Sequence, residues 1–90
     1  MGYKYVAIDH SIDKNYYGDT LISCVNQFTK IETTLTETGF KLEVTVDGYK
    51  PFNRYYSKDY TQLEAESDCL MVIANTYHNI FPNYSIYKSI

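Results

Sequence analysis

The first residues whose types could do chemistry lie together in a short stretch, residues 9–13, that follows an apolar run. This stretch contains Asp9, His10 and Asp13, and a histidine beside carboxylates can act as a general base or as a metal ligand. Loops at strand ends often hold such groups. The competing interpretation is that Asp9 and Asp13 cap a turn while His10 is simply exposed. We favour the turn, because no second motif accompanies these three residues.

Residues 5–14 resemble the start of the small ferredoxin-like nucleases of CRISPR adaptation, in which an aspartate ends the first strand. The likeness rests on Asp9 alone, and the arginine-rich segment that follows in that family is absent here. The resemblance implies a small metal-dependent nuclease that uses Asp9. We carry this as the less favoured of two alternative functions.

The sequence identifies no metal site and no catalytic pair among the two cysteines and two histidines. Cys24, Cys69, His10 and His78 show neither C-x-x-C nor H-x-x-x-H spacing. A free cysteine is commonly a small buried apolar residue. We therefore expect no catalytic residue, no metal and no cofactor, and we predict that the protein is not an enzyme.

The most unusual stretch of the chain is residues 49–58, where aromatic and basic side chains interleave. It carries a charge of +3, and because the whole chain has a net charge of −3, the remaining residues carry −6. Tyrosine and arginine are enriched at protein-interface hot spots. The same pattern can bind nucleic acid, or can be an edge strand whose aromatic rings pack on the core. We predict partner-binding residues here, namely Tyr49, Lys50, Phe52, Arg54, Tyr55 and Tyr56.

Length and composition restrict the class of protein. A chain of 90 residues makes one domain, residues 1–90, near the lower size limit for folding alone, so a homodimer is one expectation. Two cysteines are too few for a disulfide framework, and we expect a reducing, cytoplasmic setting. The mild negative charge argues against a bulk electrostatic nucleic-acid binder. No membrane-spanning apolar stretch and no signal peptide are recognised.

Alternation of apolar and polar residues predicts several strands. The clearest covers residues 40–47, where Phe40, Leu42, Val44 and Val46 alternate with polar residues. Further strands are expected at 3–8, 31–36 and 84–90. Another strand is expected at 49–55, and it should lie at a sheet edge because Pro51 has no amide hydrogen to donate.

Turns join these strands. Thr38 and Gly39 can turn the chain, and Asp47-Gly48 is a strong signal for a type I′ hairpin. Residues 9–15 are expected to form a loop.

Two helices are expected between the strands. The first covers about residues 19–29 with Asp19 as its N-cap, and the second begins after Ser57 as its N-cap. An apolar stripe at helical spacing continues the second helix to Phe81, where Pro82 stops it. The order β-α-β-β-(β)-α-β predicts an α+β fold. We expect a small antiparallel sheet with two helices on one face, in a ferredoxin-like or related two-layer sandwich.

These observations predict a small non-catalytic protein-binding module that acts through a tyrosine-rich surface, since the chain has 11 tyrosines. Residues with AT-rich codons are abundant, as in many low-GC bacteria, their phages and some archaeal viruses. A short chain of this kind suits a viral or mobile-element accessory protein that inhibits a host protein, including one of a defence system. A nucleic-acid-binding domain that uses residues 49–58 is the first alternative, and the nuclease is the second.

Overall fold

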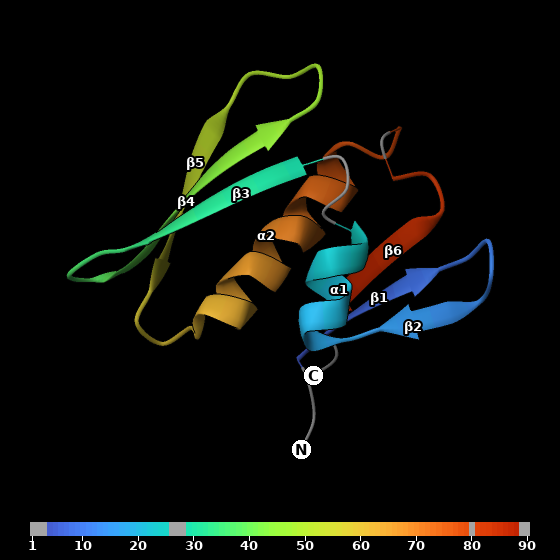
Figure 1. The fold of residues 1–90 in the computed structure, drawn as a ribbon, viewed down its shortest axis with the longest axis horizontal. Coiled ribbons are helices and arrows are strands. Elements are labelled where there is room, and N and C mark those ends of the chain that lie inside the picture. The colour runs from blue at the N-terminus through green and yellow to red at the C-terminus, as the bar shows by residue number, and fades with distance from the viewer. Residues whose placement is uncertain (1–3, 26–28, 80, 89–90) are drawn as a thin grey trace.

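The described chain forms two three-stranded antiparallel sheets and two helices (Figure 1). The computed structural model describes residues 4–25, 29–79 and 81–88. The α+β class predicted from the sequence is therefore confirmed. The elements in chain order are β1 (Tyr5–Asp9), β2 (Lys14–Tyr16), α1 (Gly18–Val25), β3 (Thr29–Leu35), β4 (Gly39–Val46), β5 (Phe52–Ser57), α2 (Gln62–Thr76) and β6 (Tyr84–Lys88).

The strand order differs from the ferredoxin-like expectation. The strands are divided between a sheet of order β2-β1-β6 and a sheet of order β3-β4-β5. Strand β1 pairs with β6 in antiparallel register, with Ala7 opposite Ile86, so the first and last strands close one sheet without the central hairpin. The ferredoxin-like order is not confirmed, because the hairpin of β3 and β4 pairs only with β5 in the described chain.

The first sheet contains a strand that we expected to be loop. Residues 14–16 form β2, which pairs with β1 after a tight turn at Asp13, where φ is +53°. Strand β1 buries Tyr5, Ala7 and Asp9 and leaves the alternate residues half-buried on its other face. Period-two alternation therefore places a carboxylate, Asp9, on the core side of the sheet.

The second sheet follows the alternation expected of its central strand. Leu42, Val44 and Val46 of β4 are buried, and the polar residues between them face the other side. Strand β5 lies at an edge, as Pro51 predicted, although it begins at Phe52 and ends at Ser57. The type I′ prediction is wrong. The amide of Tyr49 donates to the Val46 carbonyl at 3.0 Å, and of the two central residues only Gly48 has positive φ.

The second helix begins four residues later than expected. Ser57 is the last residue of β5, and Thr61 is the N-cap of α2. The Thr61 hydroxyl accepts from the Glu64 amide at 3.1 Å, while the Glu64 carboxylate accepts from the Thr61 amide at 2.9 Å. This reciprocal capping box fixes the first turn. The helix ends at Thr76, so Phe81 is a buried residue after the helix and not part of it.

The first helix is also displaced from its expected bounds. Helix α1 covers Gly18–Val25, so Asp19 lies within its first turn and is not the N-cap. Thr29 already belongs to β3. The expected helical residues 26–28 lie outside the described residues, as do residue 3 of the first expected strand, residue 80 of the second expected helix and residues 89–90 of the last strand.

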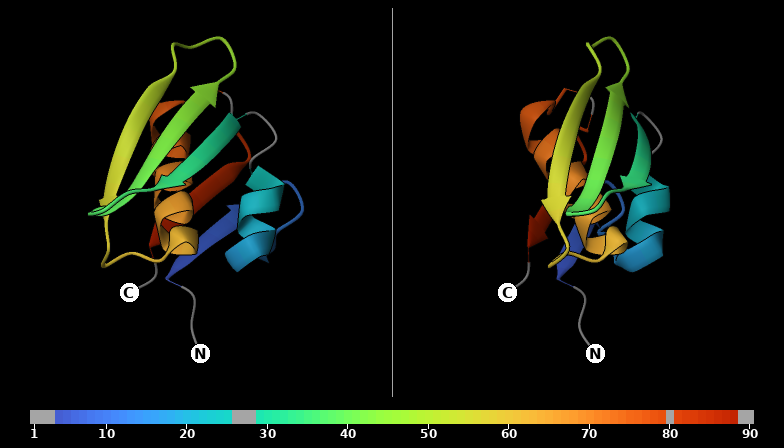
Figure 2. Two further views of the ribbon diagram at one scale, coloured as in Figure 1. Left: turned by 60° about the vertical axis from the view of Figure 1, so that its left-hand side comes forward. Right: turned by 90° about the vertical axis from the view of Figure 1, so that its left-hand side faces the viewer.

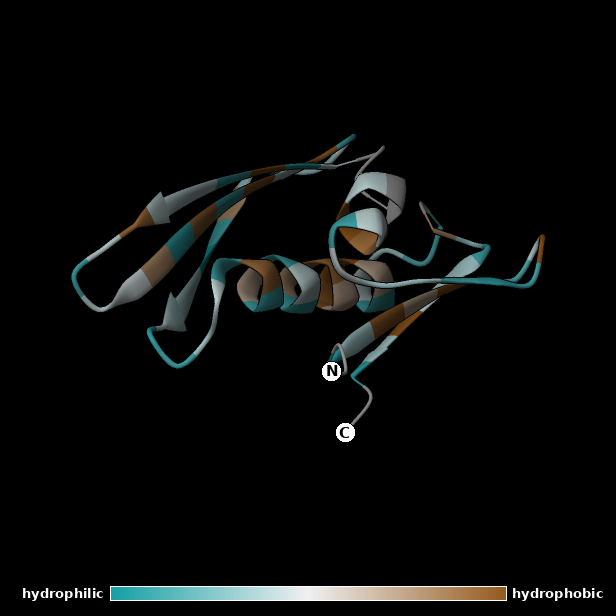
Figure 3. Ribbon diagram, turned by 60° about the horizontal axis from the view of Figure 1, so that its bottom comes forward, coloured by the Kyte–Doolittle hydropathy of each residue, from teal (hydrophilic) through white to brown (hydrophobic). Residues whose placement is uncertain are grey.

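Helix α2 lies between the two sheets, and α1 lies beside it over β1 and β2 (Figures 1 and 2). Apolar residues recur along the strands of both sheets and along α2 (Figure 3). The buried apolar residues come from every element except β2 and β3, with Leu21, Leu42, Leu70 and Ile73 fully enclosed. No helix among the described residues is long and apolar enough to cross a membrane.

Candidate binding surface on strand β5

The alternation of β5 divides the predicted partner-binding residues into two groups. Phe52, Arg54 and Tyr56 face α2, and Tyr56 is buried with 8% of its surface exposed. Tyr55 faces the opposite side and is 70% exposed. The sequence placed all of these residues in one binding set, whereas the structure assigns the inward group to the interior of the fold.

Three side chains, those of Tyr5, Arg54 and Tyr56, meet at Asp68 of α2. The hydroxyl of Tyr56 donates to Asp68 Oδ2 at 2.7 Å, and the hydroxyl of Tyr5 donates to Asp68 Oδ1 at 2.9 Å. Tyr5 belongs to β1 in the first sheet and Tyr56 to β5 in the second. One carboxylate on the central helix therefore connects both sheets.

Arg54 completes this network. Its Nε donates to the Tyr56 hydroxyl at 2.9 Å, and a terminal guanidinium nitrogen lies 3.8 Å from Asp68 Oδ2. The guanidinium also lies 5.4 Å from the centre of the Tyr56 ring. The sole arginine of the chain is thus bound within the fold, although part of its side chain reaches solvent.

Burial keeps the tyrosine donors protonated. The pKa of Tyr5 is raised, first by burial and then by its hydrogen bond to Asp68. The pKa of Tyr56 is raised by burial and by Asp68, and its contact with Arg54 only partly offsets this. Both hydroxyls therefore remain available as donors to the carboxylate throughout the neutral pH range.

The other predicted residues, Tyr49, Lys50 and Tyr55, lie on the outward side of β5 or in the turn before it. Tyr55 lies opposite Lys41 of β4. Tyr49 and Lys50 lie in the exposed turn before the strand, and the Tyr49 ring packs on Tyr77 with centres 4.3 Å apart. Asn79 donates to the Tyr49 hydroxyl at 3.3 Å. This packing holds Tyr49 in place and leaves Tyr55 and Lys50 as the most available members of the predicted set.

One further residue belongs to this surface. Lys58 follows β5 directly, Lys50 lies two residues before it, and both are exposed. Neither forms an ion pair with any residue in the described ranges. Sequence reasoning counted Lys58 in the charge of the segment but did not include it among the binding residues.

Asp9, the last residue of β1, and the residues after it form the turn that we favoured from the sequence. Asp9 Oδ1 accepts from the Ser11 hydroxyl at 2.6 Å and from the Ser11 amide at 3.0 Å. The pKa of Asp9 is lowered, chiefly by the hydrogen bond from the Ser11 hydroxyl. His10 Nε2 lies 2.8 Å from the Ser85 hydroxyl on the neighbouring strand β6. The Asp9 carboxylate therefore stabilises the turn that we expected from the sequence.

We predict that Asp9→Ala lowers the urea midpoint at pH 7 and that Asp9→Asn, which keeps an acceptor oxygen, lowers it less. Because the folded-state pKa of Asp9 lies below its unfolded value, its stabilising effect is present above about pH 4 and is lost at lower pH. The difference between wild type and Asp9→Ala should therefore close in acid. Magnesium-dependent cleavage of DNA or RNA that Asp9→Asn abolishes would instead establish the nuclease alternative.

Two of the remaining candidate ligands, Cys69 and His78, have described side chains. Cys69 is buried within α2, and burial raises the pKa of its thiol to about 12. His78 is exposed after the helix. No group of three or more histidine, cysteine, aspartate or glutamate residues within the described ranges could hold a metal ion.

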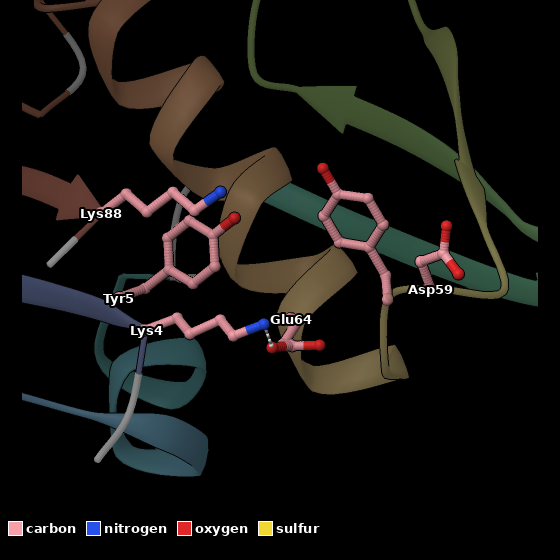
Figure 4. A pocket seen from close by; sticks show the side chains of 6 residues that line it. Lys4, Tyr5, Asp59, Glu64 and Lys88 are labelled. Carbon is pink, nitrogen blue, oxygen red and sulfur yellow. Dashed lines mark ion pairs between the residues drawn. The ribbon is translucent and has the colours of Figure 1, made fainter. Parts of the chain in front are cut away.

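A pocket of about 200 Å³ lies where the turn after β5 meets the first sheet. Lys4 reaches across it to Glu64 at 2.8 Å, and Lys88 extends beside Tyr5 (Figure 4). Asp59 lies on the far side of the pocket from Lys88 (Figure 4). Its two ammonium groups and two carboxylates balance, so the pocket presents no net field that would select a charged ligand.

Comparisons with known proteins leave the candidate surface to be judged on its geometry. No family model, no curated protein and no solved structure matches the chain.

Proposed function

We propose that this chain is a non-catalytic protein-binding module that contacts its partner through the outward side of β5 and the turns on either side of it. The observation that carries the proposal is Tyr55. It stands 70% exposed in an edge strand, while the alternate residues of the same strand hold the fold together. An exposed tyrosine offers a large amphipathic contact area at a low cost in side-chain entropy.

Charge and contacts favour a protein partner over nucleic acid. Arg54, which would be the natural phosphate ligand, already binds Tyr56 and Asp68. Outside residues 49–58 the chain carries −6, which repels a polyanion. The affinity for a protein partner should therefore fall only modestly between 50 and 200 mM salt, whereas phosphate contacts would give a steep fall.

The finer proposal concerns biological setting. A viral or mobile-element protein that inhibits a host factor remains our proposal from codon-related composition. A homodimer remains a prediction as well, and light scattering over a range of concentrations measures it.

Site-specific photo-crosslinking tests the function. We expect benzoylphenylalanine in place of Tyr55 to give a protein adduct in the native host, and unlabelled wild-type chain should compete it away. The same group in place of Thr34, an exposed residue of β3 at the other edge of the same sheet, is the matched control. Failure of Tyr55 to crosslink, or equal adducts from both positions, would contradict the proposal.

A further inference from the structure

We propose that the partner presents an extended acidic segment that adds to the unpaired edge of β5, with one acidic side chain near Lys50 and another near Lys58. This inference rests on the proposed function and specifies the chemistry of the partner. Two independent features of β5 carry it, its position in the sheet and the charges at its ends.

The backbone of β5 offers the first feature. In the described chain β5 pairs with β4 and has no strand on its other side. An edge strand presents a row of amide and carbonyl groups to which another extended chain can add by main-chain hydrogen bonds. The six residues of β5 give enough length for such a ladder.

The two lysines offer the second feature. Lys50 lies two residues before β5 and Lys58 directly after it, and the chain between them would span at most about 26 Å if it were fully extended. Neither has an ion-pair partner in residues 4–25, 29–79 and 81–88. Asp59, the nearest acid to Lys58 in the chain, lines the pocket of Figure 4 instead. Two uncompensated cations therefore frame the strand in a chain that is otherwise negative.

Tyr55, which lies between the two lysines in the sequence, determines which type of side chain the middle of the partner segment should carry. Tyr55 is exposed on the outer face beside Lys41, whose ammonium lies 3.6 Å from Glu43. A β-branched or aromatic side chain on the added strand would pack on the Tyr55 ring as a cross-strand pair. The partner segment is thus acidic at both ends and apolar near its centre.

The other edge of the same sheet lacks these charges. Strand β3 carries Lys30 and Glu32 on its exposed face, so it has no excess of positive charge. A peptide that bound through backbone pairing alone would add equally to the β3 and β5 edges, whereas an acidic peptide should prefer the β5 edge. This contrast makes β3 the internal control.

The probe is a nine-residue peptide of alternating threonine and valine with glutamate at both ends, acetylated and amidated. We expect it to slow amide hydrogen exchange in residues 52–57 and to leave residues 29–35 unchanged. The double variant Lys50→Glu/Lys58→Glu should bind it at least tenfold more weakly, and Lys30→Glu should bind it as wild type does. A matching peptide with lysine at both ends should prefer the double variant over wild type.

Three outcomes would overturn the inference. These are equal protection of β3 and β5, unchanged affinity in the double variant, and binding of single-stranded oligonucleotide but not of the acidic peptide. The two proposals fail separately. If a partner crosslinked at position 55 retains full affinity for the double variant, the acidic-strand inference is wrong while the protein-binding function stands. If no protein adduct forms, the function itself is wrong.

Discussion

Replacement of Asp68 by alanine is expected to lower the free energy of unfolding by about 4 kcal/mol, because two hydroxyls lose their shared acceptor and one guanidinium loses its counter-charge. The hydroxyls of Tyr5 and Tyr56 would lose bonds of 2.9 and 2.7 Å, and Arg54 would lose its nearby counter-charge. All of this occurs where the carboxylate is 14% exposed, so water replaces the lost contacts poorly. A domain of this size has a total stability of only about 5–13 kcal/mol.

Urea unfolding at pH 7 measures the effect as a shift in midpoint at unchanged slope. Asp59→Ala is the matched control, since Asp59 is an exposed carboxylate whose loss should cost no more than about 0.5 kcal/mol. Tyr5→Phe and Tyr56→Phe should each cost about 1–2 kcal/mol. Equal stability of the two aspartate variants would show that the network does not hold the sheets together.

The same network should respond to alkali. The pKa values of Tyr5 and Tyr56 are raised in the folded state, so their stabilising effect is complete below about pH 10 and declines above it. The difference between wild type and Asp68→Ala should therefore narrow as the pH rises above 10. A difference that grows with alkali would contradict the assignment of both hydroxyls as donors.

Replacement of Gly39 by alanine is expected to cost about 3–5 kcal/mol and to disrupt the pairing of β4 with β5. Gly39 has φ of +152°, a conformation that side chains rarely adopt. A Cβ there would press on the Tyr56 carbonyl oxygen and lie 2.7 Å from the Ser57 carbonyl carbon. Both obstacles are backbone atoms of the paired strand, so neither can move aside without breaking the ladder.

Gly48→Ala is the matched control for this prediction. Gly48 also has positive φ, +84°, but nothing lies within 4 Å of a Cβ built there. Gly48→Ala should therefore lose only about 1–2 kcal/mol of stability, from backbone strain. Thermal or urea unfolding measures both variants, and amide exchange should show faster opening of β5 in Gly39→Ala alone. Equal losses in the two variants would mean that close strand contact contributes nothing at Gly39.

Local pattern was sufficient for some features of this chain. Alternation from Phe40 to Val46 predicted a half-buried strand, and the missing amide hydrogen of Pro51 predicted an edge position for the strand that follows it. These predictions succeeded because period and hydrogen-bonding capacity belong to neighbouring residues in the sequence. The start of α2 was also available in the sequence, since Thr61 and Glu64 have the spacing of a capping box, but Ser57 was preferred.

Only the tertiary structure decided how the strands divide into two sheets and which side of β5 remains exposed. Alternation shows that a strand has two faces but does not name the element that covers either one. Tyr5 and Asp68 are 63 positions apart, and no local pattern indicates that they meet. Residues 49–58 were therefore recognised as unusual from sequence, yet their separation into a structural half around Arg54 and an available half around Tyr55 depended on where α2 packs.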